Sequence, residues 1–211
     1  MYLNTEAVVL SRRNFGEADR IITLFTRDHG KITVLAKGVR RPRSKKAGHL
    51  EIGSWCKIFV ARGKNLDLLT EVEIKHAFGI SEFSESKANK IYHLLEIIKN
   101  ITPDGQRNQK AFVMLVHFLK QISKGEDFNL VSSTFKIKLL SNLGFFTVRQ
   151  MPDSRTKNIL STIENEPYER IKETVKLTSS SYLKLLSFLD SMIEELTERK
   201  LNTRKLFNPS V

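Results

Sequence analysis

The most chemically distinctive stretch of the sequence is a run of cations between residues 37 and 46. It reads Lys37-Gly38-Val39-Arg40-Arg41-Pro42-Arg43-Ser44-Lys45-Lys46, with six cations in ten residues and no acid. Lysine and arginine bind the phosphates of a polynucleotide and displace its condensed counterions, with a salt slope of about −0.7 to −0.9 for each phosphate. A charge run is most often a solvated face, but this density of cations without acids favours nucleic-acid contact.

The overall charge also favours a polyanionic partner. The 211 residues include 35 Lys and Arg against 23 Asp and Glu, a formal net charge of +12. Residues 1–80 hold 15 of the basic and 8 of the acidic residues, so this shorter part carries more than half of the excess. Such a charge attracts nucleic acids and anionic membranes alike. The candidate nucleic-acid-binding residues lie in the run and beside the first predicted turn: Lys37, Arg40, Arg41, Arg43, Lys45, Lys46, Arg12, Arg13 and Arg20.

Several classes of function lack the residues that they need. Cys56 is the only cysteine and the five histidines are scattered, so we expect no disulfide framework, no metal and no cofactor. The sequence has no phosphate-binding glycine loop, no HExxH and no Ser/His/Asp set, so we expect neither an enzyme nor a small-molecule substrate. No apolar run approaches the roughly 20 residues that cross a bilayer, and the first residues do not form a signal peptide. We therefore expect no membrane partner and a cytoplasmic location.

The elements that position the basic run are predicted to be strands. Five short β-rich segments precede residue 80, at 7–10, 21–26, 32–35, 58–61 and 66–74. Glycine-containing turns separate them, which is typical of a small barrel or sandwich. The basic run directly follows the third strand, and Pro42 and Gly48 make a helix there unfavourable. We therefore predict a flexible loop at the rim of the barrel.

The fourth predicted strand alternates between two faces. Side chains in a strand point to opposite sides with a period of two, which places Cys56, Ile58 and Val60 in the interior. Cys56 is then a small buried hydrophobe rather than a nucleophile. Binding of unpaired bases needs exposed aromatic rings. The candidates for base stacking, each more often a core residue, are Phe15 in the first turn and the outward-facing Trp55 and Phe59.

Beyond residue 80 the apolar spacing becomes that of helices. Four stripes repeat at three- and four-residue intervals, as expected for helices that pack into a core. They are Ile91, Leu94, Leu95, Ile98 and Ile101; Phe112, Leu115, Val116, Leu119 and Ile122; Phe135, Leu139, Leu140 and Leu143; and Leu183, Leu186, Leu189, Ile193 and Leu196. The residues from Thr178 to Ser181 predict an N-cap for the last helix. We divide the chain into a nucleic-acid-binding domain, 1–80, and a helical domain, 81–211.

Three motifs of the N-terminal part together resemble the signature of the RecO family of recombination mediators. They are Phe15-Gly16-Glu17-Ala18-Asp19-Arg20, Leu24-Phe25-Thr26-Arg27-Asp28-His29-Gly30 and Ala36-Lys37-Gly38-Val39-Arg40-Arg41-Pro42-Arg43-Ser44. Their order and spacing match a strand hairpin followed by a basic Ala-Lys-Gly-x-Arg loop. The match is specific over residues 1–75. It is compatible over the helical remainder, where residues 201–207 resemble the family's C-terminal tail.

The resemblance implies an α+β fold, with a five-stranded OB-fold barrel followed by an all-helical domain. It implies a bacterial, nucleoid-associated protein that binds single- and double-stranded DNA and anneals complementary strands. It also implies that RecR and single-strand-binding protein are partners, and that RecA is loaded onto coated DNA in the RecF pathway. Many family members carry a cysteine zinc module in the C-terminal part. With one cysteine this chain lacks it, and residues 144–178 replace or omit it.

Two further expectations concern partners. The helical domain is predicted to contribute additional DNA contacts and to offer an apolar groove to the acidic, hydrophobic C-terminal tail of single-strand-binding protein, with Lys110 and Lys120 as candidate contacts. Two other classes of function fit the composition. One is an OB-fold RNA-binding accessory protein, and the other is a scaffold whose basic loop binds an acidic protein. Competition between DNA and RNA of one sequence distinguishes the first, and failure to bind nucleic acid at moderate salt indicates the second.

Overall fold

The computed structural model describes residues 2–44, 46–78, 84–148 and 154–207. Five strands come first in the chain and six α-helices follow within these ranges, which confirms the predicted α+β order. The chain divides into two compact units. Unit 1 is Met1–Ser123 with Leu201–Val211, and unit 2 is Lys124–Lys200.

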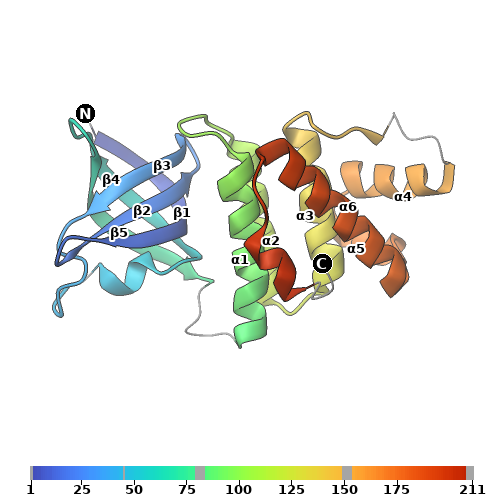
Figure 1. The fold of residues 1–211 in the computed structure, drawn as a ribbon, viewed down its shortest axis with the longest axis horizontal. Coiled ribbons are helices and arrows are strands. Elements are labelled where there is room, and N and C mark those ends of the chain that lie inside the picture. Colours follow the sequence, from blue (N-terminus) through green and yellow to red (C-terminus); the bar gives the residue numbers. More distant parts are fainter. Residues whose placement is uncertain (1, 45, 79–83, 149–153, 208–211) are drawn as a thin grey trace. The chain divides into compact units, whose positions relative to one another are not determined.

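The strands form a closed barrel, as predicted (Figure 1). Their bounds are β1 Tyr2–Phe15, β2 Asp19–Thr26, β3 Gly30–Ala36, β4 Ser54–Ala61 and β5 Asp67–Ala77. The order around the barrel is β1-β2-β3-β5-β4. All neighbours are antiparallel except β3 and β5, which are parallel. The long β1 pairs with both β2 and β4, and a register shift between Val9 and Ser11 bends it from one partner toward the other.

The barrel interior follows the predicted alternation. Cys56, Ile58 and Val60 of β4 are fully buried in the core cluster, which confirms the assignment of this face. Burial raises the pKa of the Cys56 thiol to about 12, as expected of a buried hydrophobe rather than a nucleophile. The core also contains Val39 and Leu50, which come from the connection between β3 and β4.

That connection is the basic segment. Its residues from 37 to 44 form successive turns, and a single 3-10 turn follows at Ala47–Leu50. The sequence predicted a loop without any helix, and the structure differs from that prediction only in this short 3-10 turn. Val39 and Leu50 anchor the segment because each buries its side chain in the barrel. Lys45 lies outside the described residues. The loop at the barrel rim is therefore held at two apolar points and presents its charged residues between them.

Helices α1, Glu85–Ile101, and α2, Gln109–Ser123, belong to the same unit as the barrel. Every member of their two predicted apolar stripes is buried. The ring of Phe25 in β2 lies 6.2 Å from that of Phe112 in α2. Lys31 of β3 donates to the backbone oxygens of Lys99 and Thr102, at 2.6 and 2.7 Å, at the C-terminal end of α1. These contacts fix the barrel to the helical hairpin.

Gly30, the first residue of β3, makes a close backbone approach within unit 1. Its φ is +67°, and a Cβ atom there would overlap the backbone of Gln106 in the α1–α2 connection. We expect Gly30→Ala to lower the free energy of unfolding by about 2–4 kcal/mol, from left-handed strain and from the overlap. Chemical denaturation followed by far-UV circular dichroism measures it.

Gly105→Ala is the matched control for this substitution. Gly105 has a nearly identical φ of +69° in the same connection, but nothing lies within 4 Å of its added Cβ atom. Only the backbone cost of about 1–2 kcal/mol is expected there. Equal losses for the two variants would contradict the close approach.

The last described residues return to unit 1. Leu201 is buried, and a 3-10 turn at Asn202–Leu206 packs on α1. The carboxylate of Glu96 accepts hydrogen bonds from the backbone N–H groups of Asn202 and Thr203, both at 2.9 Å. The predicted family tail is thus fastened to α1, so both ends of unit 2 join unit 1.

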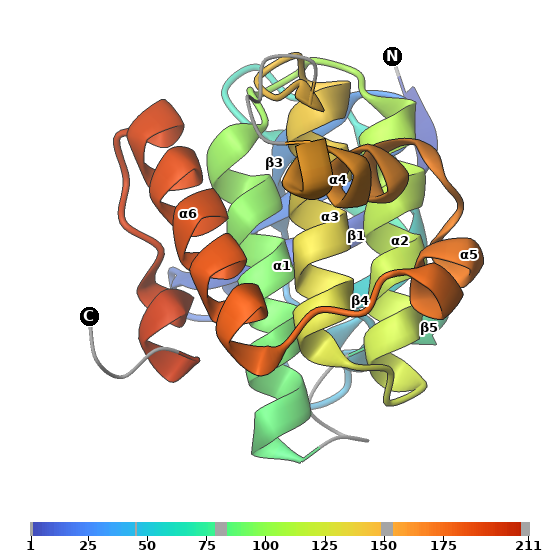
Figure 2. The ribbon, with the colours of Figure 1, turned by 90° about the vertical axis from the view of Figure 1, so that its right-hand side faces the viewer.

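Unit 2 contains α3 Phe128–Asn142, α4 Ser154–Asn165, α5 Tyr168–Thr174 and α6 Ser179–Thr197. In Figure 2, α4 lies across α3. Thr178 caps α6 by accepting from the N–H of Ser181, which confirms the predicted cap. Between α3 and α6, Lys136 and Asp190 form an ion pair at 2.6 Å whose side chains are only 1% and 5% exposed.

The predicted stripe of α6 is wrong at both ends. Leu186, Leu189 and Ile193 are buried, but Leu183 is 48% and Leu196 42% exposed. The predicted residues are spaced mostly three apart, whereas one turn of an α-helix takes 3.6 residues. Over several turns the first and last of them therefore move round the helix, away from its packed face. Tyr182 and Asp190 are buried instead. Within the described ranges no helix is both long and apolar enough to span a membrane.

Candidate nucleic-acid interface

The β1–β2 turn and the basic loop form one connected structure. Asp19 Oδ1 accepts a hydrogen bond from the N–H of Gly38 at 2.7 Å. The N–H of Arg40 donates to the Ala18 oxygen at 2.9 Å, and its guanidinium donates to the Gly16 oxygen at 3.2 Å. Gly38 has a φ of +65°, which the tight turn of this loop requires. The acidic residue of the turn therefore positions the loop backbone, and the two motifs that resemble the family signature contact each other.

Six arginines lie in the β1–β2 hairpin and in the basic loop that hydrogen-bonds to it. We call them the arginine surface, and they are Arg12, Arg13, Arg20, Arg40, Arg41 and Arg43. Burial lowers the pKa of the Arg20 guanidinium, and repulsion from Arg12 and Arg40 lowers it further, against attraction to Glu51. Like charges held together in this way repel each other until an anion binds between them. The positive charges of Arg12, Arg20 and Arg40 therefore act on one another.

The predicted DNA-binding cations differ in whether they have a partner within the protein. Among the described residues, no carboxylate pairs with Arg13, Lys37, Arg41 or Arg43, and all four are exposed. Arg20 Nε donates a hydrogen bond to the side-chain oxygen of Asn14, at 3.5 Å. By contrast, Arg12 pairs with Glu51, and the Lys46 ammonium donates to the backbone oxygen of Leu69 at 3.2 Å.

The three aromatic candidates lie in different settings. Phe15 is 48% exposed in the β1–β2 turn, within the same motif as the arginines. The Trp55 indole N–H donates to Glu6 at 3.1 Å. The ammonium groups of Lys75 and Lys120 lie 5.1 and 4.8 Å from the centroid of the Trp55 ring. Phe59 has Lys57 at 5.6 Å from its centroid. Among the described residues, Phe15 is the candidate ring for which no cation–π contact is found, and it lies in the same β1–β2 hairpin as Arg12, Arg13 and Arg20.

The two candidate partner-binding lysines do not share one site. Lys110 lines a shallow, mainly apolar groove of about 510 Å³ on one face of α2, with Gln109, Val113, Met114 and His117. Val113 is 55% exposed at its centre. Lys120 lies instead over Trp55 of the barrel. Only Lys110 is thus placed as the sequence analysis predicted for a groove.

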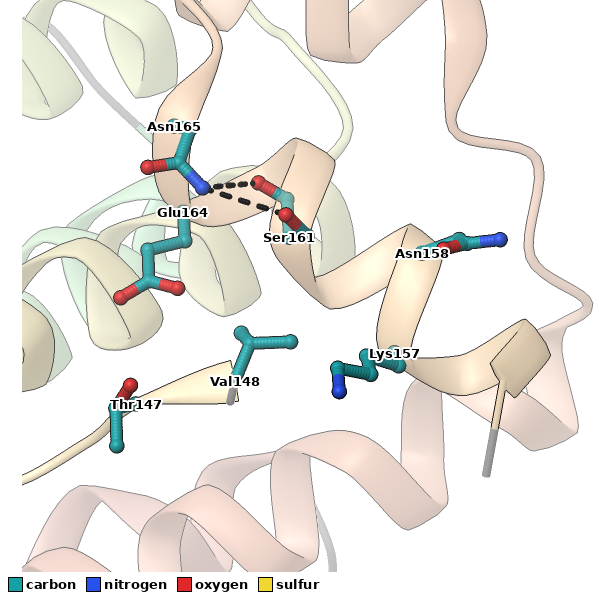
Figure 3. Close-up of a pocket in the computed structure, with 7 residues that line it drawn as sticks. All are labelled: Thr147, Val148, Lys157, Asn158, Ser161, Glu164 and Asn165. Atoms are coloured by element: carbon teal, nitrogen blue, oxygen red, sulfur yellow. Dashed lines mark hydrogen bonds between the residues drawn. The ribbon is translucent and has the colours of Figure 1, made fainter. Parts of the chain in front are cut away.

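Unit 2 contains a second hollow, a polar pocket of about 480 Å³ beside α4 (Figure 3). Its lining includes Lys157 and Glu164, which carry opposite charges. The Asn165 side chain donates to the Ser161 backbone oxygen at 2.9 Å, and Glu164 accepts from Ser141 at 2.6 Å. These polar groups bond within unit 2. Unlike the arginine surface, this pocket therefore combines both signs of charge.

Two residues of the interface were missed from the sequence. Glu51 reaches Arg12 from 39 positions away, and Tyr92 of α1 lies close enough to both for their charges to act on its hydroxyl. Burial raises the pKa of Tyr92, Arg12 lowers it and Glu51 raises it. No spacing signal links these positions, because folding of the barrel against α1 brings them together.

Known proteins resemble the chain in two adjoining segments. Residues 1–78 match the family model described as the N-terminal part of recombination protein O, and residues 91–148 match its C-terminal counterpart. The chain belongs to the RecO family. The matches confirm the family identified from the three motifs, and the first of them covers the whole barrel.

Individual RecO proteins show the same relationship. The DNA repair protein RecO of Pelotomaculum thermopropionicum is 30% identical over 143 residues, which are 68% of this chain and 56% of that protein. The namesakes from Dehalococcoides mccartyi and Symbiobacterium thermophilum are 31% and 32% identical over 141 and 145 residues. Each match covers 67% of this chain and 56% of the relative. The chain thus spans little more than half the length of the curated RecO proteins that it matches.

Many RecO proteins carry a zinc module, which the single cysteine of this chain led us not to expect. In the described part of the chain, no three His, Cys, Asp or Glu side chains come together as metal ligands. The segment predicted to replace or omit the module instead contains α4 and α5, with residues 149–153 outside the described ranges.

Proposed function

We propose that this chain is a non-enzymatic recombination mediator that binds single- and double-stranded DNA through the arginine surface. The observation that carries the proposal is the exposure of four guanidinium groups of the arginine surface, those of Arg13, Arg40, Arg41 and Arg43, none of which has a carboxylate partner among the described residues. Membership of a family whose relatives are named DNA repair proteins supports it. In this proposal the guanidinium groups contact phosphates, which position the DNA without selecting its sequence.

Annealing follows from the same charges. Two complementary strands repel each other through their phosphates, and at physiological salt this repulsion acts over about 8 Å. Cations that lie between the strands remove part of that barrier. Phe15 stacks on an unpaired base beside them, which orients a strand without selecting its sequence. The bases remain accessible for pairing because the protein holds the backbone.

The partner contacts are a second part of the proposal. The α2 groove fits the acidic, hydrophobic C-terminal tail of single-strand-binding protein, since it combines exposed Val113 with the cation of Lys110. RecR cooperation and RecA loading follow from the family. In this scheme the barrel domain, 1–80, holds the DNA and residues 81–211 bind partners and add DNA contacts. The protein then works in the cytoplasm, at the nucleoid.

Annealing of strands precoated with their cognate single-strand-binding protein tests this function. We expect this chain to accelerate annealing of coated strands, and Lys110→Glu to abolish most of that acceleration because it reverses the charge beside the acidic tail. Fluorescence transfer between end-labelled strands follows the reaction. Lys176→Glu, at an exposed lysine of unit 2, is the charge-matched control.

Competition between DNA and RNA of the same sequence for binding to this chain distinguishes the proposed mediator from an OB-fold RNA-binding protein. An RNA-specific site recognises the 2′-hydroxyl and prefers RNA strongly, whereas a phosphate site that ignores this group shows similar affinities. A strong preference for RNA, or no acceleration of annealing on bare strands, would exclude the mediator function.

A further inference from the structure

Glu51 stands out within the arginine surface. It follows the 3-10 turn that ends the basic segment, and its carboxylate forms an ion pair with Arg12 of β1. Among the described residues it is the only carboxylate paired with a member of the arginine surface. Among the described loop cations, none forms an ion pair with a carboxylate. One position of this surface is therefore already occupied by an acid of the chain itself.

The surroundings of the Arg12–Glu51 ion pair would allow a phosphate to replace the carboxylate. The Arg12 and Glu51 side chains are 26% and 45% exposed, so incoming phosphate can reach both. Glu51 also attracts the Arg20 guanidinium, and Arg20 feels the repulsion of Arg12 and Arg40. A carboxylate presents two oxygens to a guanidinium in the way that a phosphate does. Glu51 Oε1 thus accepts from Arg12 Nη1, a donor that a DNA phosphate could also use.

We infer that Glu51 is an intramolecular competitor for one phosphate of the bound polynucleotide. Binding exchanges the carboxylate for a phosphate oxygen on Arg12, and release restores the internal pair. The inference rests on the proposed DNA binding. Because the exchange makes and breaks one ion pair, Arg12 adds little to wild-type affinity. The competitor keeps binding weak enough for an annealed duplex to leave.

Glu51→Gln tests the competition. This variant keeps the size of the side chain and removes its charge, so Arg12 becomes available to phosphate. We expect the affinity for an oligothymidine to rise about five- to eightfold at ~0.1 M salt, and the log–log salt slope to steepen by about 0.7–0.9. Fluorescence anisotropy at a series of salt concentrations gives both values. Exposed ion pairs contribute little to folding, so the variant is expected to fold, and its thermal melting curve checks this.

Two further variants separate competition from a general charge effect. Glu126→Gln changes the net charge equally and also breaks an ion pair, with Lys172 in unit 2 at 2.5 Å. It is expected to leave the salt slope unchanged. In an Arg12→Ala background, Glu51→Gln should lose most of its effect, because the guanidinium it released is gone.

The outcomes distinguish this inference from the function on which it rests. The competitor role would be overturned if Glu51→Gln folds but leaves the salt slope of DNA binding unchanged. It would also be overturned if Glu51→Gln raises DNA affinity as much in the Arg12→Ala background as in the wild-type chain. If substitution of the loop arginines still weakens DNA binding in the same experiments, the proposed DNA interface stands without it. If the wild-type chain does not bind the oligonucleotide, the proposed function fails and the inference with it.

Discussion

Replacing Arg40, Arg41 and Arg43 together with alanine is expected to weaken binding of single-stranded DNA by about 100-fold or more at ~0.1 M salt. Each exposed guanidinium neutralises one phosphate in this account, and three lost contacts also flatten the salt slope by about 2 to 3. Anisotropy titrations at several salt concentrations measure both changes. Loss of affinity with an unchanged slope would indicate misfolding or a non-ionic contact instead.

The control for this variant removes the same charge elsewhere. Lys176, Lys184 and Arg199 are exposed in unit 2, and their combined replacement with alanine lowers the net charge equally. We expect a much smaller loss of affinity, since these three residues do not belong to the arginine surface. Arg41→Ala with Arg43→Ala is a second control, because Arg40 also hydrogen-bonds Gly16 and its loss can loosen the loop. Equal losses for the loop and unit 2 variants would mean that net charge alone drives binding.

The second large effect is on stability and concerns unit 2. Lys136→Met is expected to lower the free energy of unfolding by about 3–5 kcal/mol, because it leaves the buried Asp190 carboxylate without its cation. Urea denaturation followed by circular dichroism measures the loss. The double variant with Asp190→Leu is expected to recover much of it, since an apolar pair of similar volume avoids the cost of burying charge.

Lys172→Met provides the matched comparison for the buried pair. Lys172 also forms an ion pair, with Glu126, but it stands in solvent, so its loss is expected to change stability little. A large loss for Lys172→Met, or none for Lys136→Met, would contradict the difference in burial on which the prediction depends.

The barrel was predictable because its strands alternate. In β4 every second side chain is buried, so the sequence pattern alone orients Cys56, Ile58 and Val60. In β1 and β2 the alternation fails, because Val8 and Phe25 are buried on the outer side as well. A continuous apolar run of this kind indicates a strand covered on both faces. That signal predicts a cover for the barrel, but it does not identify α1 and α2.

The candidate site was predictable in location but not in its internal pairing. The cations of the basic loop were visible as a run, and the structure places them beside the β1–β2 turn through Asp19 and Arg40. The pairing of Arg12 with Glu51 depends on how the 3-10 turn meets β1, which no local pattern encodes. In unit 2, α4 escaped detection because its short apolar set, Leu160 and Ile163 among polar residues, spans barely one turn.

Chemical footprinting of arginines tests the central claim most directly, because it locates the DNA on the protein without any amino-acid substitution. An arginine-selective dicarbonyl reagent is applied with and without bound oligothymidine, and mass spectrometry gives the modification rate at each site. The account predicts strong protection of Arg13, Arg41 and Arg43, and unchanged rates at the exposed Arg170 and Arg199 of unit 2. Protection confined to unit 2, with the loop arginines as reactive as in the free protein, would contradict it.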